Sequence, residues 1–192
     1  VGRSQRNMTV KCGGITNGKR TQARINNYDN QRFLTIIGLD VFSFGLNRAS
    51  QLANYSTPRQ ALHLLVRTVS NGGNFLLDFG PTADGRMPLF VQDLLTSIGE
   101  WLGVNGDAIY RTRPWSVRNE PANNHTWIYY TRDKHANSIV YATFLSWKSN
   151  HLLLTVPEPS SNTVITLLGH NQPLSYQFNA SEGLLITLPQ LT

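Results

Sequence analysis

The sequence predicts an α/β fold followed by an all-β fold: a partial (β/α) barrel segment with a C-terminal antiparallel β-sandwich. Between residues 33 and 110, two strand-like apolar runs alternate with two amphipathic helical patterns, which is typical of parallel α/β units. After residue 115, short apolar runs recur at close spacing between Asn, Ser, Gly and Pro clusters, as in a sandwich. With 192 residues, 40% of them hydrophobic, the chain can build a substantial core.

The first 32 residues carry the positive charge of the chain. They hold seven Lys and Arg residues against Asp29 alone, while the formal net charge of the whole sequence is +6. We see neither helical nor strand periodicity there, so we expect residues 1–32 to form a basic, loop-rich segment. A nucleic-acid or heparin-binding arm is the alternative, but charge runs of this kind are usually solvated, and we expect no nucleic-acid partner.

The first α/β unit is predicted from residues 33–37, an apolar, β-branched run that indicates a buried strand. A helix should follow, because Thr57 can act as the N-cap, Pro58 suits the first helical position and Gln60 completes a capping box. The glycines at 72 and 73 should end this helix.

The second unit begins at residues 74–79, whose nearly continuous apolar character indicates a parallel strand covered on both faces. Pro88 then starts a second helix that ends near residues 105–106. Its apolar stripe consists of Val91, Leu94, Leu95, Ile98, Trp101 and Leu102.

The composition changes after Trp115, and we place the seam between the two parts at residues 112–122. Residues 33–115 then form the barrel segment and residues 116–192 the sandwich. The predicted sandwich strands lie at residues 127–130, 139–147, 152–156, 164–168 and 184–188.

Familiar cofactor motifs are incomplete in this sequence. Residues 13–19 fit the phosphate-loop pattern G-x-x-x-x-G-K, but Arg20 stands where a Ser or Thr would reach magnesium. The five histidines lack metal-ligand spacing, and Cys12 lies in what we expect to be a polar loop. We therefore expect no cofactor and no metal, and no apolar run is long enough to span a membrane.

Four N-glycosylation sequons occur in predicted loops or turns, where a glycan could be accommodated. Together they favour the secretory pathway, with a secreted or lysosomal protein, although the first residues do not read as a signal peptide. The sequon asparagines are Asn7, Asn54, Asn124 and Asn179.

Asp78 is the clearest candidate site residue that the pattern alone provides. It ends the second predicted barrel strand, and such folds place functional groups at the carboxyl ends of their strands. A structural hydrogen bond would explain Asp78 equally well. Either role requires a dedicated partner, because burying a carboxylate without one is costly.

Residues 69–85, 99–110 and 112–115 resemble the α-L-fucosidase family of retaining glycoside hydrolases, and residues 43–48 and 188–191 continue the resemblance. The resemblance implies a catalytic β/α barrel followed by a β-sandwich. It implies hydrolysis of terminal α-L-fucose with net retention and a fucosylated glycan or glycoprotein as ligand. On this basis the candidate residues of the substrate rim are Phe44, Arg48, Asp78 and Trp115.

The resemblance also implies that this chain holds only part of a site. A complete barrel takes about 250 residues, and the family's nucleophile belongs to an earlier strand. The positions that resemble those of the acid hold Arg20, Gln31 and Arg32. We therefore assign no catalytic residue, although Asp29, Asp40 and Asp78 remain as carboxylates that could be recruited.

Two hypotheses about function follow. In the first, the chain is the C-terminal portion of an α-L-fucosidase-like hydrolase and is inactive alone. An N-terminal barrel half, a second copy or another protein then covers its exposed edges. In the second, the chain is a non-catalytic, fucosidase-derived carbohydrate-binding or structural protein.

Overall fold

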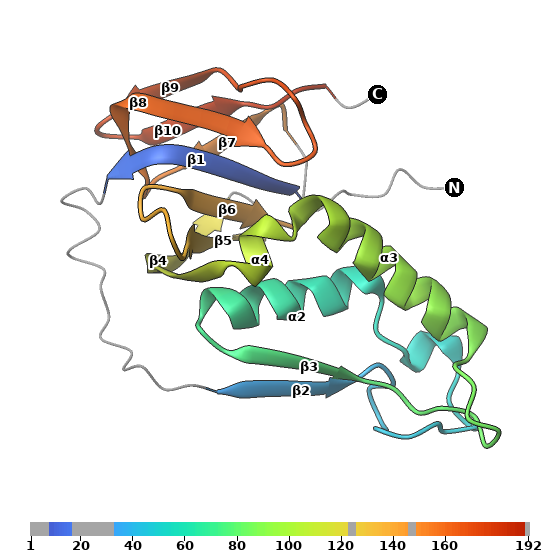
Figure 1. Ribbon diagram of the computed structural model, residues 1–192. Helices are drawn as coiled ribbons and strands as arrows, with labels where there is room; N and C mark the ends of the chain where they lie inside the picture. The colour runs from blue at the N-terminus through green and yellow to red at the C-terminus, as the bar shows by residue number, and fades with distance from the viewer. Residues whose placement is uncertain (1–7, 17–32, 123–125, 146–148, 191–192) are drawn as a thin grey trace.

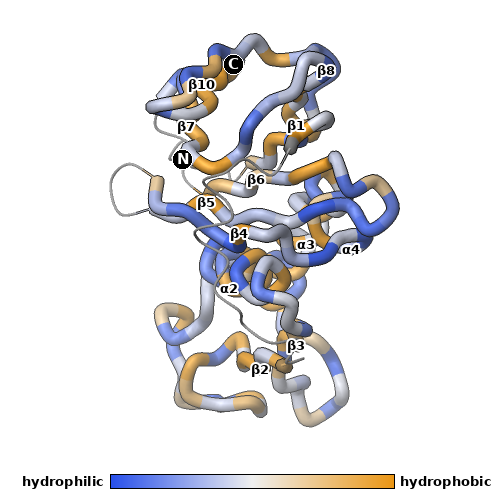
Figure 2. The backbone as a smooth tube through the Cα atoms, turned by 90° about the vertical axis from the view of Figure 1, so that its left-hand side faces the viewer, coloured by the Kyte–Doolittle hydropathy of each residue, from blue (hydrophilic) through white to orange (hydrophobic). Residues whose placement is uncertain are grey.

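The computed structural model describes residues 8–16, 33–122, 126–145 and 149–190 (Figure 1). A β-sandwich occupies one end of the molecule and a small parallel sheet the other, with the helices between them. Helix α2 lies between the parallel sheet and the larger sheet of the sandwich (Figures 1 and 2). The predicted fold class, a partial barrel segment followed by an antiparallel sandwich, is confirmed.

The barrel segment consists of β2 (Leu34–Gly38), β3 (Asn74–Asp78) and the helix α2 (Pro58–Ser70) that connects them. The two strands are parallel, as predicted. The short 3-10 helix η1 (Leu52–Asn54) precedes α2. The predicted capping box is present, because Gln60 N donates to Thr57 Oγ1 at 3.3 Å and Thr57 N donates to Gln60 Oε1 at 2.8 Å.

The second predicted helix is also confirmed. Helix α3 (Leu89–Asn105) follows Pro88, and the short α4 (Asp107–Tyr110) follows it directly. The apolar stripe of α3 faces α2, where Val91, Leu94 and Ile98 are buried in one cluster with Leu62 of α2. The amphipathic periodicity therefore identified the packing face of α3 correctly.

Two predictions of burial are wrong for this chain: residues 33–37 are not a fully buried strand, and residues 74–79 are not covered on both faces. Helix α2 covers one face, where Thr68 Oγ1 donates to Thr35 Oγ1 at 3.1 Å. On the other face, which we call the open face, Leu34, Ile36 and Leu76 are 54%, 48% and 47% exposed. Figure 2 shows the apolar colouring along β2 and β3, at the end of the molecule away from the sandwich.

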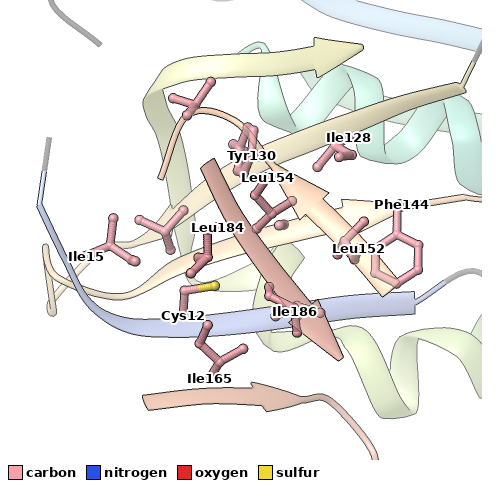
Figure 3. Packing of buried hydrophobic residues seen from close by; sticks show 14 of the residues in the cluster. Cys12, Ile15, Ile128, Tyr130, Phe144, Leu152, Leu154, Ile165, Leu184 and Ile186 are labelled. Atoms are coloured by element: carbon pink, nitrogen blue, oxygen red, sulfur yellow. The ribbon is translucent and has the colours of Figure 1, made fainter. Parts of the chain in front are cut away.

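The sandwich packs a five-stranded sheet, in the order β4-β5-β6-β1-β8, against a three-stranded sheet, in the order β7-β10-β9. Its core fills the space between the sheets with apolar side chains from both (Figure 3). The strands are β4 (Thr112–Ala122), β5 (Thr126–Asp133), β6 (Val140–Phe144), β7 (His151–Leu154), β8 (Glu158–Leu167), β9 (Tyr176–Asn179) and β10 (Gly183–Thr187).

The prediction of a loop throughout residues 1–32 is wrong for residues 8–16, which form strand β1 (Met8–Thr16). This strand pairs with β6 on one side and β8 on the other, so the N-terminal segment completes the larger sheet. Cys12 is fully buried in the sandwich core and does not lie in a polar loop (Figure 3). Burial raises the pKa of its thiol to about 12, which makes the thiolate scarce at neutral pH.

The phosphate-loop pattern begins within β1. Gly13 pairs with Val164 of β8, and Ile15 pairs with Pro159 across a register shift. Gly14 adopts φ +74°, a conformation that suits glycine, at this irregularity. The backbone of residues 13–16 is thus part of a sheet, and residues 17–20 of the pattern lie outside the described residues.

The predicted seam, residues 112–122, is the edge strand β4 of the larger sheet. Contacts between α2 and the sandwich join the two parts of the chain. Arg59 Nη2 donates to the carbonyl of Leu145 at 2.9 Å, and His63 Nε2 lies 2.9 Å from Tyr129 Oη. The limits that we assign to the three segments, residues 1–32, 33–115 and 116–192, stay a prediction.

Candidate functional site

The carboxyl ends of β2 and β3 form the candidate site. Because the strands are parallel, Gly38 and Asp78 lie opposite each other at the same edge of the sheet. The carbonyl of Asp78 accepts a hydrogen bond from Leu39 N at 2.8 Å, which extends the pairing past the end of β2. In barrels of strands and helices, this edge carries the functional groups. We call it the strand-end site and define it by Asp40, Phe42, Phe44, Arg48 and Asp78.

Asp40 anchors the loop that follows β2. Its carboxylate accepts hydrogen bonds from Phe42 N at 2.9 Å and from Ser50 Oγ at 2.5 Å, and the residue is buried. Backbone bridges join Asp40 to Ser43 and to Tyr55. Burial raises the pKa of the Tyr55 phenol, and the negative charge of Asp40 raises it further. A buried carboxylate with a hydrogen bond on each oxygen holds the loop in place, which is a structural role.

Two glycines allow the loops of the strand-end site to approach each other closely. A Cβ at Gly80 would clash with the backbone of Gly45 and Leu46. A Cβ at Gly38 would lie 2.7 Å from the carbonyl oxygen of Ser43. The loop after β2 therefore packs directly against the segment after β3, which fixes one relative to the other.

A cavity of about 420 Å³ opens at this loop beside β2. Within the loop, Phe42 and Phe44 are 76% and 62% exposed. A concave, mostly apolar space of this size with a few polar groups is suited to a small ligand. Its lining includes Ile36, Gly38, Asp40, Phe42, Phe44 and Leu64.

Of the four predicted rim residues, Phe44 lines the cavity of the strand-end site. Phe44 and Arg48 belong to the exposed loop after β2, and Asp78 is half-buried at the end of β3. In the described part of the chain, the Asp78 carboxylate has no hydrogen bond or ion pair. Among the described residues, no group of three or more His, Cys, Asp and Glu side chains could hold a metal ion.

The fourth predicted rim residue, Trp115, is not at this site. It is 5% exposed in the sandwich core, where its ring packs against Tyr130 with the centroids 5.1 Å apart. Trp115 lies on the inward face of β4, and the sheet leaves it no access to a ligand. Phe42, which is not among the predicted site residues, also lines the cavity and is exposed. An aromatic residue two positions after Asp40 is a signal in the sequence that could have identified it.

The sequons differ in their surroundings. Asn179 is exposed at the end of β9. Asn54 is half-buried, and its Oδ1 accepts a hydrogen bond from Gln51 N at 2.8 Å. Several positions of the sequence analysis lie outside the described residues: Asn7, Arg20, Asp29, Gln31, Arg32 and Asn124.

Two family models match the chain. The model named alpha-L-fucosidase matches residues 3–107, and the model named alpha-L-fucosidase C-terminal domain matches residues 119–192. The chain belongs to the α-L-fucosidase family. Its first matched segment includes β1, so a strand assigned by sequence to the fucosidase domain lies in the sandwich sheet of this structure.

Curated fucosidases are similar to this chain over most of its length. Tissue alpha-L-fucosidase of Mus musculus is 41% identical over 154 residues, which cover 80% of this chain and 33% of the relative. Tissue alpha-L-fucosidase of Rattus norvegicus is 36% identical over 186 residues, which cover 96% and 39%. Plasma alpha-L-fucosidase of Rattus norvegicus is 39% identical, with 80% and 33% covered. The chain thus spans about a third of the length of these curated relatives.

Solved fucosidase structures share the fold. The alpha-fucosidase of Thermotoga maritima in complex with fucose superposes with a TM-score of 0.74 and 30% identity, covering 85% of this chain and 38% of that one. The GH29 alpha-L-fucosidase of Bacteroides thetaiotaomicron gives a TM-score of 0.69 at 25% identity, with 84% and 35% covered. Together with the match to the C-terminal domain, these coverages identify the chain as a C-terminal portion of a fucosidase.

In the described part of the chain, neither long helix combines the length and the apolar character that a membrane crossing requires.

Proposed function

We propose that this chain provides the last barrel elements and the sandwich of an enzyme that hydrolyses terminal α-L-fucose from glycoconjugates with net retention. Family membership supports the reaction class, and the strand-end site supports the place of the chemistry. Phe44, Arg48 and Asp78 would then contribute to the rim that contacts the fucosylated ligand. Relatives named plasma fucosidases, together with the sequons, support the secretory pathway, with a secreted or lysosomal product.

The open face of β2 and β3 is the observation that carries this proposal. Parallel sheets are normally covered on both faces, because their strands are apolar on both sides. Here Leu34, Ile36 and Leu76 remain largely exposed on the face opposite α2. In a closed barrel this face would line the packed interior. We therefore propose that the N-terminal part of a fucosidase barrel is the partner that covers it, in preference to a second copy or an unrelated protein.

We further propose that the chain alone is inactive. Retaining hydrolysis takes a nucleophile and an acid with carboxyl groups about 5–5.5 Å apart. At the strand-end site, the Asp40 carboxylate is occupied by Phe42 N and Ser50 Oγ. Asp78 then remains as one available carboxylate among the described residues of the site. One carboxylate can contribute to binding but cannot perform both steps.

Complementation tests the proposal. The purified chain would be mixed with the N-terminal part of mouse tissue α-L-fucosidase, cut before the region that this chain matches, and assayed with an aryl α-L-fucoside. We expect no turnover from either part alone and turnover from the mixture. An Ile36→Lys, Leu76→Lys variant should abolish turnover by the mixture, because it places two charges on the open face. A Leu153→Lys change on the sandwich surface should not.

Turnover by the chain alone would contradict the proposed inactivity. Asp29→Asn, Asp40→Asn and Asp78→Asn variants would then identify the carboxylate responsible. If no turnover appears in the mixture although the two parts form a complex, the chain does not complete a fucosidase site.

A second candidate function, a non-catalytic carbohydrate-binding module, is favoured by the exposed Phe42 and Phe44 beside the cavity. Aromatic rings with a large exposed face can pack against the apolar face of a sugar ring. Titration of the chain with L-fucose, followed by tryptophan fluorescence and calorimetry, tests this function. Binding that Phe44→Ala abolishes and Phe178→Ala preserves would support it, because Phe178 is exposed on the sandwich, in β9.

A further inference from the structure

The turn between β9 and β10 presents a sequon in an exposed, well-defined conformation. Asn179 Oδ1 accepts hydrogen bonds from Ser181 N at 2.9 Å and from Ser181 Oγ at 2.7 Å. Glu182 N donates to the carbonyl of Asn179 at 3.1 Å, which closes a four-residue turn with Ala180 in its second position. In the described part of the chain, Asn179 Nδ2 makes no hydrogen bond, so the nitrogen that would carry a glycan is unoccupied.

The other described sequon offers less room. Asn54 is half-buried in η1, and Ser56, the third residue of its sequon, is 8% exposed. Ser56 N also donates to the carbonyl of Leu39, which ties the sequon to the end of β2. By contrast, Asn179, Ala180 and Ser181 are all exposed. Of the two, the turn after β9 is the site that a bulky glycan fits without displacing packed residues.

Strand β9 has an exposed edge. It is an edge strand, because β10 is its one partner in the three-stranded sheet. Gln177 is exposed and Phe178 is 42% exposed on this strand. An exposed edge with an apolar side chain is a template for pairing with another chain, and natural proteins commonly shield such edges. Asn179 is the last residue of this strand.

We propose that Asn179 carries an N-linked glycan, and that this glycan shields the β9 edge from association with other chains. The site rests on the proposed passage through the secretory pathway. In the reaction, Asn179 Nδ2 attacks C1 of the first N-acetylglucosamine of a lipid-linked oligosaccharide. The new N–C1 bond replaces the bond from C1 to the lipid pyrophosphate, which leaves with the electron pair. The amide nitrogen loses one proton, and no oxidation or reduction occurs.

The test expresses the full chain behind a cleavable secretion signal in cultured animal cells. An amidase that removes N-glycans converts the attached Asn to Asp, so peptide mass spectrometry identifies each occupied sequon. Ala180→Pro is the sharpest variant, because proline between Asn and Ser blocks glycosylation and suits the second position of the turn. Ser181→Thr is the matched control, since it preserves the sequon. We expect the glycan in wild type and in Ser181→Thr, and its loss in Ala180→Pro.

Sedimentation velocity then tests the shielding. We expect glycosylated chain to sediment with less self-association than Ala180→Pro or amidase-treated chain, and a Phe178→Ser change to reduce the association of unglycosylated chain. Secreted chain without a glycan at Asn179 overturns the site, whereas the cellular location of the natural protein is measured separately and tests the secretory proposal. Equal self-association with and without the glycan overturns the shielding role.

Discussion

At the residue scale, Glu120 shows how a buried charge is accommodated in the sandwich core. It is fully buried in β4, where it accepts hydrogen bonds from Tyr130 Oη of β5 and from the hydroxyl of Thr155. Thr155 N also donates to both Glu120 oxygens at 3.1 Å. Thr155 follows β7, so this one carboxylate links the two sheets. Burial raises the pKa of Tyr130 well above its ordinary value, and the negative charge of Glu120 is the next largest cause.

Replacing Tyr130 by Phe tests this network. The change removes one donor from a buried carboxylate, and we expect the free energy of unfolding to fall by about 1.5–3 kcal/mol. Urea denaturation followed by circular dichroism measures it. Tyr176→Phe is the control, because its hydroxyl donates a weaker bond of 3.3 Å to the carbonyl of Thr163 at a partly exposed site. Equal losses in the two variants would show that Glu120 does not depend on Tyr130.

At the element scale, the helices follow from local chemistry and several strands do not. The start of α2 is determined by Thr57, Pro58 and Gln60, all within four residues of one another. Strand β1 has no such local determinant. Lys11 and two glycines interrupt its pattern, and it becomes a strand because β6 and β8 offer their edges on both sides. Strands β4 and β9, which the sequence analysis also missed, likewise depend on partners distant in sequence.

Thr57→Ala should destabilise α2 by removing the side chain that accepts from Gln60 N. The expected loss is about 1 kcal/mol in the free energy of unfolding, as for other N-cap replacements. Thermal and urea unfolding measure it. Thr96→Ala, at an exposed interior position of α3, should be neutral or slightly stabilising, because alanine favours helix interiors. A loss as large as that of Thr57→Ala would show that capping is not the cause.

At the scale of the whole molecule, α2 is the layer that holds the barrel segment and the sandwich together. Val66 of α2 is buried against Tyr129 and Leu145 of the sandwich side. His63 pairs with Tyr129 at the same interface. Burial, then the positive charges of Arg67 and Arg59, lowers the pKa of His63. The interface is therefore compatible with a neutral His63 and resists its protonation.

This interface should make stability depend on pH. The pKa of His63 is lower in the folded chain than its ordinary value of 6.5, so the unfolded chain takes up the proton first. Its contribution to stability is complete above about pH 7.5 and is lost as the pH falls below about 6.5, the ordinary pKa of histidine. Urea unfolding at a series of pH values from about 8 downward should show that the free energy of unfolding falls less in His63→Gln than in wild type. Arg67→Gln should also reduce the loss, since it removes one repelling charge; an unchanged profile in both variants would contradict this account.

In the candidate site, too, some features follow from the local sequence and others depend on the tertiary structure. The position of Asp78 could be predicted because a carboxylate at the end of an apolar strand is recognisable in the sequence, whereas its part in ligand binding stays a prediction. Trp115 could not be placed from sequence, because it lies where the register between β4 and β5 shifts, between Pro114 and Asn119, and simple strand alternation does not predict the face there. The anchoring role of Asp40 required the hydrogen bond from Ser50, ten residues away.

The family, the order of elements in the barrel segment, the two helices and the packing face of α3 could all be predicted from the sequence, because periodicity and capping act over a few residues. Tertiary structure alone decided that residues 8–16 complete the larger sheet and that Cys12 and Trp115 are buried. It also decided that one face of β2 and β3 is open. These outcomes depend on which strand edges and faces find partners, and that pairing joins residues more than a hundred positions apart, such as Val10 and Ala142.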